Sequence, residues 1–219
     1  MTGGKPIAAD ATGAGLPALT DAETMRVAAA YGPLANAVRE LVEATVLTDV
    51  DDDVVMHAKA AIEAVTESLR ERSRPAGLNY IVGGANRALG NAVVGVCNPL
   101  APPLVVHHEA VGRCWSEFVL GPSYEGPPNL VHGGISAMIL DQLLGEAASE
   151  RMSKPRFTGT ITVRYLRSTP LGEPLRCEAW IDRIQGFKSF ARGTISDSAG
   201  ITVEAEGIFI VPGWARDPS

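Results

Sequence analysis

A histidine, two glycines and an acid are spaced along one stretch of the chain in a way that could support chemistry. Residues 124–148 begin as a loop, because Gly-Pro-Pro at 126–128 excludes a helix, and they end in the most apolar helix-like run of the sequence. His-Gly-Gly at 132–134 marks the join, and Asp141 follows nine residues after the histidine. Amide N–H groups at a helix start can bind an oxyanion or a carbonyl oxygen. A carboxylate in an apolar helix is costly unless it has a partner or a function. The stretch therefore predicts an active site.

Composition limits the classes of protein to consider. The chain has 219 residues, 46% hydrophobic and 20% charged, as expected for a globular domain with an appended helical part. A net charge of −6 argues against binding to nucleic acid. No apolar run has the roughly 18 residues of a membrane span, and the first residues do not resemble a secretory signal, so we expect a cytoplasmic protein. Cys97, Cys114 and Cys177 lack metal-site spacing, so we expect reduced, buried thiols in strand-like segments, with no metal and no cofactor.

The first 90 residues predict helices. Thr20 and Glu23 fit a capping box that opens a helix through Thr45, with an interruption at residues 32–33. Acidic residues at 51–53 suit the start of a second helix. Its apolar positions follow a three-four spacing and predict a packed face: Val55, Ala58, Ile62, Val65 and Leu69. Residues 75–91, rich in glycine and asparagine, predict a loop.

From residue 91 the pattern changes to strands around a single helix. Strand-like runs are expected at 92–97, 112–120, 159–167, 175–184, 188–196 and 201–211. Short turns at 185–186 and 197–200 predict hairpins. His107 and His108 are neighbours, so on a strand their rings would point to opposite faces, and we interpret them as a loop pair and not as a metal site. An apolar helix must be wrapped, and one antiparallel sheet curled around it achieves this, so the expected fold class is α+β.

The order of these elements resembles the hotdog-fold thioesterases, and most closely their PaaI-like group. The resemblance is carried by Tyr-Glu-Gly-Pro-Pro-Asn-Leu-Val-His-Gly-Gly at 124–134, by Asp141, and by residues 164–171, which are similar to the family's third strand. It implies a hotdog fold, an antiparallel β-sheet wrapped around a long central helix, with an N-terminal helical extension. The domain boundaries expected are 1–18 for a disordered lead, 19–90 for the extension, 91–213 for the hotdog domain and 214–219 for a tail.

The resemblance also implies a homodimer, or a dimer of dimers, with active sites between subunits. Gly134 N–H would be the oxyanion donor, and Asp141 of the other subunit the general base or the nucleophile. Thr158 would help to hold the attacking water, although an ordinary strand-edge threonine fits equally well. His132 would position the thioester or simply fit the turn. The family's asparagine six residues before the histidine is Gly126 here.

An acyl-CoA substrate would need further contacts. The residues expected to bind it are Gly133, Asn129, Lys188 and Arg164. Lys188 is the first choice for a CoA phosphate, since that position is commonly basic in the group, and a solvated surface cation is the alternative for both basic residues. The expected function is an acyl-CoA thioesterase for a medium-to-long or aromatic acyl group. The alternatives are a non-catalytic acyl-CoA or lipid binder and, less favoured, a hydratase of the same fold.

Overall fold

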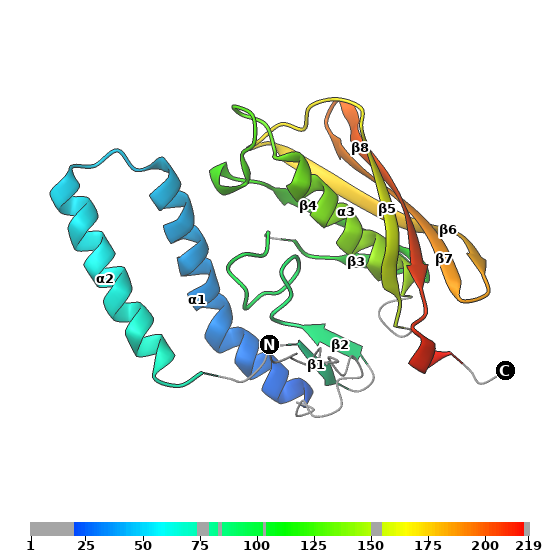
Figure 1. The fold of residues 1–219 in the computed structure, drawn as a ribbon, viewed down its shortest axis with the longest axis horizontal. Helices are drawn as coiled ribbons and strands as arrows, with labels where there is room; N and C mark the ends of the chain where they lie inside the picture. Colours follow the sequence, from blue (N-terminus) through cyan, green and yellow to red (C-terminus); the bar gives the residue numbers. More distant parts are fainter. Residues whose placement is uncertain (1–19, 74–78, 83–84, 103, 150–154, 217–219) are drawn as a thin grey trace, which may run out of the picture.

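A helical hairpin and a sheet crossed by one helix make up the structure (Figure 1). The computed structural model describes residues 20–73, 79–82, 85–102, 104–149 and 155–216. The lead expected to be disordered, residues 1–18, lies outside the described residues, as does the end of the expected tail. No helix among the described residues is long and apolar enough to cross a membrane.

The sheet is antiparallel throughout and has the expected hotdog arrangement. Its six strands lie in the order β3 (His107–Ala110), β4 (Arg113–Val119), β6 (Pro174–Gln185), β7 (Lys188–Asp197), β8 (Gly200–Ile210) and β5 (Phe157–Tyr165). The expected turns join β6 to β7 and β7 to β8, and Gly186 and Gly200 have the positive φ that such turns favour. The helix α3 (Gly133–Ala148) packs across one face of this sheet, so the predicted fold class is confirmed.

The core lies between α3 and the sheet. Ile139, Leu140, Leu143 and Leu144 of the helix are fully buried, and alternate residues of β4, β6 and β7 point toward them. The helix lies close to the strands at Gly193, where an added Cβ would be 3.3 Å from Leu144 Cδ2. The helix is therefore held on the sheet along its apolar side.

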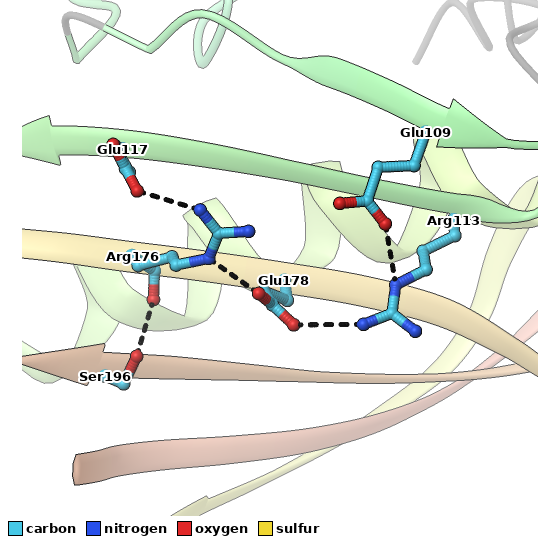
Figure 2. A network of polar contacts seen from close by, with 6 residues as sticks. All are labelled: Glu109, Arg113, Glu117, Arg176, Glu178 and Ser196. Atoms are coloured by element: carbon cyan, nitrogen blue, oxygen red, sulfur yellow. Dashed lines mark hydrogen bonds and ion pairs between the residues drawn. The ribbon is translucent and has the colours of Figure 1, made fainter.

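The opposite, outer face of the sheet is covered by alternating charges (Figure 2). Arg176 contacts Glu117 at 2.8 Å and Glu178 at 2.6 Å. Glu178 also accepts from Arg113 at 3.4 Å, and Arg113 pairs with Glu109 at 3.2 Å. Exposed ion pairs of this kind each contribute about 1 kcal/mol or less. This part of the outer face is therefore suited to contact with water. The apolar residues of these strands are buried on the other face, against α3.

The first helix, α1 (Asp21–Leu47), confirms the capping box, since Glu23 N donates to Thr20 Oγ1 at 3.2 Å. The expected interruption is wrong, because Pro33 lies inside a continuous helix. Val27, Gly32 and Ala35 are buried, and an added Cβ at Gly32 would be 3.2 Å from Val96. We infer that packing along this buried side keeps the helix continuous despite the missing proline N–H.

The second helix, α2 (Asp52–Arg70), begins where the acidic residues predicted. Its apolar face does not pack as expected, because none of its residues is buried in this chain. It lies at the outside of the molecule, beyond α1 (Figure 1).

Three connecting segments differ from expectation. The predicted loop at 75–91 contains a hairpin of β1 (Asn79–Val82) and β2 (Ala85–Ala88), so the extension is not purely helical. Residues 92–97 form turns and not a strand, because Asn91 Oδ1 accepts from the amides of Val93 and Val94. His107 and His108 lie in β3 and not in a loop.

Truncation of a core residue tests this packing. We expect Leu144→Ala to lower the free energy of unfolding by about 2–5 kcal/mol, since it leaves a cavity between α3 and β7. Leu100→Ala, at a position 67% exposed, should change it by about 0.5 kcal/mol or less. Urea unfolding followed by circular dichroism measures both, and equal effects would contradict the assigned core.

Candidate active site

The start of α3 is fixed by the side chain of His132. This residue is the N-cap, with φ −61° and ψ 130°, and its Nδ1 accepts from Gly134 N–H at 3.0 Å. Its own N–H donates to Tyr124 O at 2.9 Å. Because Nδ1 accepts, the proton of the neutral ring is on Nε2, which can donate to another group. His132 and Gly134 are both exposed.

Tyr165 of β5 contacts the same turn. Its hydroxyl donates to Gly133 O at 2.8 Å, and a Cβ added to Gly133 would be 3.3 Å from the tyrosine ring. Residue 133 must therefore be small for the ring to lie here. A hollow of about 250 Å³ lies beside this contact and is lined in part by Gly133, Ser136, Tyr165 and Arg167.

The Arg167 guanidinium at this hollow is already paired. It donates to Asp197 Oδ2 at 2.8 Å and also to Gly200 O. This pairing holds the pKa of the Asp197 carboxyl at about 2, well below its usual range. The Arg167 guanidinium is thus bonded to the β7–β8 turn. It would have to leave these partners to bind a ligand in the hollow.

The acid predicted from the sequence lies on the open side of α3, toward β5. Thr158 Oγ1 donates to Asp141 Oδ1 at 2.9 Å, so these two residues are brought together. Asp141 is half-buried and Thr158 is exposed. Gly134 and Asp141 are seven residues apart on one helix, so their backbones are about 10 Å apart along its axis. One chain therefore does not bring its own helix start to its own acid.

The expected substrate-binding residues are spread over the domain. Asn129 has φ 62°, and its N–H donates to Glu125 Oε1 at 2.6 Å. Arg164 is paired with Glu204 at 2.8 Å. Lys188 lies at the β6–β7 turn, with its Nζ 5.9 Å from the centre of the Phe187 ring. None of these contacts joins them to Asp141.

The structure explains why residue 126 is a glycine. Its N–H donates to Leu130 O at 2.9 Å, and an added Cβ would lie only 2.8 Å from His132 Cα. An asparagine would force the loop away from the histidine. The loop therefore has no space for the family's asparagine, and Gly126 brings residue 132 close to the turn before it.

A second acid on α3 was missed by the sequence analysis. Glu146 is buried, accepts from Gln142 Nε2 at 3.0 Å and lies 3.6 Å from His108 Nε2. Burial raises the pKa of its carboxyl. The only signal in the sequence is a second acid five residues after Asp141 in the same apolar run. Glu146 is 9% exposed whereas Asp141 is half-buried, so Asp141 is the more accessible of the two acids.

None of the three cysteines forms a disulfide bond. Cys114 and Cys177 are buried on β4 and β6, and burial raises the pKa of the Cys114 thiol to about 12. Cys97 is half-buried in a turn, so the expectation of a strand is wrong for this residue. The described residues contain no cluster of histidines, cysteines and acids that could hold a metal.

Comparison with known proteins identifies the family. The family model of the thioesterase superfamily matches residues 128–204, which include α3, Asp141 and Thr158. A solved crystal structure of a thioesterase superfamily protein is 30% identical, with a TM-score of 0.74, and the alignment covers 82% of this chain and 90% of that one. The chain therefore belongs to the thioesterase superfamily, and its domain has the hotdog fold.

Two sequence relatives have a named activity. The acyl-coenzyme A thioesterase THEM4 of Xenopus laevis is 31% identical over 106 residues, which are 48% of this chain and 47% of that protein. THEM4 of Bos taurus is 28% identical over 92 residues, 41% of this chain and 37% of that protein. The matched stretch thus spans less than half the length of either relative.

A substitution at Gly126 tests the assigned loop geometry. We expect Gly126→Asn to lower Tm by about 2–10 °C, because the new side chain would displace residue 132. Gly213→Asn is the matched control, since residue 213 lies outside the left-handed region and no atom lies within 4 Å of its added Cβ. Differential scanning calorimetry measures both. If Gly126→Asn unfolds at the wild-type temperature, the loop can accommodate the side chain and the assigned geometry is wrong.

Proposed function

We propose that the chain hydrolyses acyl-CoA thioesters at a site made by two subunits. The observation that carries this proposal is the Thr158–Asp141 hydrogen bond on the open side of α3. A carboxylate held by one donor and accessible from outside is suited to activate water or to attack a carbonyl itself. Family membership and the THEM4 relatives support the same reaction class.

The helix start would bind the thioester oxygen. Gly134 N–H lies in the first turn of α3, where the helix dipole favours negative charge. In the isolated chain this N–H is bonded to His132 Nδ1, so the oxyanion would share the donor or displace the ring. The Nε2–H of the exposed His132 ring would supply a second donor near the helix start. Gly133, packed against Tyr165, keeps the turn small enough for a substrate to approach.

Asp141 would act on the carbonyl carbon. One of its oxygens accepts from Thr158, which leaves the other to take a proton from water as that water attacks. The tetrahedral intermediate then expels the CoA thiolate, and the thiolate takes the proton back from Asp141. The products are the free acid and CoA. Direct attack by Asp141 would give a mixed anhydride, which water then hydrolyses to the same products.

The second subunit would dock along β5. This strand ends the sheet in the described part of the chain, where it pairs with β8, and none of its nine positions is buried. Such an edge invites another strand. Pairing of β5 with its copy would bring the helix start of one subunit to Asp141 of the other. The homodimer thus closes the 10 Å gap within one chain. A dimer of dimers is the larger assembly of the same kind.

The CoA part would lie toward the exposed basic residues. Lys188 is at the end of the sheet nearest to Phe157, since both residues are in register with Ile210. Arg164 would have to exchange its ion pair with Glu204 for a phosphate, so Lys188 is the better candidate. Asn129 would contribute from the loop before the helix start, where its backbone is already held by Glu125 and Leu171.

Substitution of the acid tests the proposal. We expect Asp141→Asn to lower kcat for acyl-CoA hydrolysis by about 100- to 10,000-fold, the contribution of a positioned base. Thr158→Val should lower it by about 10- to 100-fold, because the carboxylate loses one charge-assisted hydrogen bond. Release of free thiol from a panel of acyl-CoAs with short, long and aromatic chains measures both variants.

Thr162→Val is the matched control for Thr158. Thr162 lies on the same strand and lines a hollow with Arg192 and Glu206, away from α3. Its substitution should leave kcat within twofold of wild type. Wild-type hydrolysis that persists in Asp141→Asn would refute the role of the acid. Tight binding of acyl-CoA by the wild type without any thiol release would favour the non-catalytic binder instead.

A further inference from the structure

The helix α2 has a long apolar face that the described part of the chain does not cover. Of its 19 residues only Thr66 is half-buried, and all the others are exposed. The helix lies beyond α1 at the outside of the molecule (Figure 1). Most helical stability in proteins comes from the packing of an apolar face, and an isolated helix of a few turns is marginal in water. Within the described residues, α2 therefore lacks the contact that would stabilise it.

The apolar residues of α2 are spaced for packing against another helix. They recur at intervals of three, four, three and four residues, which is the spacing of a helix–helix seam: Val55, Ala58, Ile62, Val65 and Leu69. The four large ones are between 39% and 56% exposed. The adjoining part of the hairpin adds more exposed apolar side chains: Leu41, Val42, Val46, Leu47, Val50 and Val54. A contiguous apolar patch of this kind marks an interaction surface.

The charges of α2 favour an antiparallel copy of the same helix. Asp52 and Asp53 lie at its start, and Arg70 and Arg72 lie at its end, on either side of Glu71. An antiparallel copy places the acidic start of each helix beside the basic end of the other, whereas a parallel copy places acid beside acid. An antiparallel pair also has two-fold symmetry, so one self-complementary face serves both copies.

The first residues of the chain do not match this face. Residues 1–19 lie outside the described residues, and their large apolar side chains are few: Met1, Ile7, Leu16 and Leu19. Gly13, Gly15 and Pro17 lie among them, so the three-four spacing is absent and a helix is disfavoured. A second copy of α2 has both the spacing and the charges.

We propose that α2 pairs with α2 of a second copy of this chain in antiparallel orientation, so that the helical hairpin is an interface between subunits. The midpoint between the acidic and the basic ends lies at residues 61–62, so Ile62 lies beside the two-fold axis and close to the partner's Ile62. Val55 lies seven residues earlier, which places it about 20 Å from the partner's Val55 and beside the partner's Leu69. This interface uses no residue of the β5 edge, and the inference does not rest on the proposed function.

Cysteine cross-linking in the full-length chain tests the pairing and its direction. On oxidation with copper phenanthroline, Ile62→Cys should give about tenfold more disulfide-linked dimer than Ala60→Cys, since residue 60 lies on the opposite side of the helix. The wild type measures the background from its own three cysteines. Val55→Cys alone should not exceed this background, whereas Val55→Cys combined with Leu69→Cys should cross-link as Ile62→Cys does.

Two cross-linking results would overturn the inference. Equal yields from Ile62→Cys and Ala60→Cys would mean that the disulfide bonds form by random collision. Cross-linking of Val55→Cys alone as readily as Ile62→Cys would mean that the helices pair in parallel.

Hydrogen exchange shows whether the face is covered. The amides of residues 55–69 should exchange about tenfold faster in Ile62→Glu than in the wild type, because the carboxylate opposes burial of the seam. Ala60→Glu is the matched control and should stay within about twofold of the wild type. Equal exchange in the wild type and Ile62→Glu would show that nothing covers the face. Protection of α2 without any cross-link at Ile62→Cys would show that a different partner covers it, and either result overturns the inference.

Discussion

The open edge of the sheet at β5 is the constraint on which the site depends. A terminal strand leaves its outer backbone groups without a strand partner, and β5 has no buried residue. Asp141, Thr158 and the helix start all lie toward this open side, half-buried or exposed. The groups proposed to act in catalysis thus lie at a surface that folding of one chain does not cover. A second copy would complete the sheet and the site in one step.

The helix α3 is buried against the sheet on one side and accessible at Asp141 on another. Its residues Ile139, Leu140, Leu143 and Leu144 are buried on the sheet, and this fixes how α3 is rotated. That rotation leaves Asp141 toward β5 and puts Glu146 inside, beside Gln142 and near His108. Two acids of one helix thereby have different environments. Packing therefore decides which of the two acids is accessible from outside the chain.

Much of the fold could be predicted from the sequence because local and global preferences agree after residue 91. The last four strands alternate, their turns are short, and the apolar helix needs a cover, so only the ends shift by a residue or two. The failures occur where side chains override propensity. Asn91 caps the amides of Val93 and Val94 and turns an apolar run away from a strand. In α1, burial of Gly32 and Ala35 accompanies a helix that continues past Pro33.

The site was only partly predictable for a related reason. The motif placed the helix start, and the sequence named Asp141 and Thr158 as site residues but did not predict the hydrogen bond between them. The bond from Gly134 N–H to His132 and the burial of Glu146 depend on the folded geometry and on contacts between distant segments. Neither residue type nor spacing reports these. Gly126 shows the same limit. The sequence shows only that the family's asparagine is absent, whereas the structure shows that the backbone of residue 132 leaves no space for it.

The central claim is that one site uses the helix start of one subunit and the carboxylate of its partner. Mixed dimers of His132→Ala and Asp141→Asn test it most directly, because each mixed dimer would contain one site with both defects and one site with neither. Where each variant alone is inactive, random mixing should restore about one quarter of the wild-type rate of acyl-CoA hydrolysis, since half of the dimers are mixed and each has one intact site. If mixed dimers form and no activity returns, both groups act within a single chain and the account is wrong.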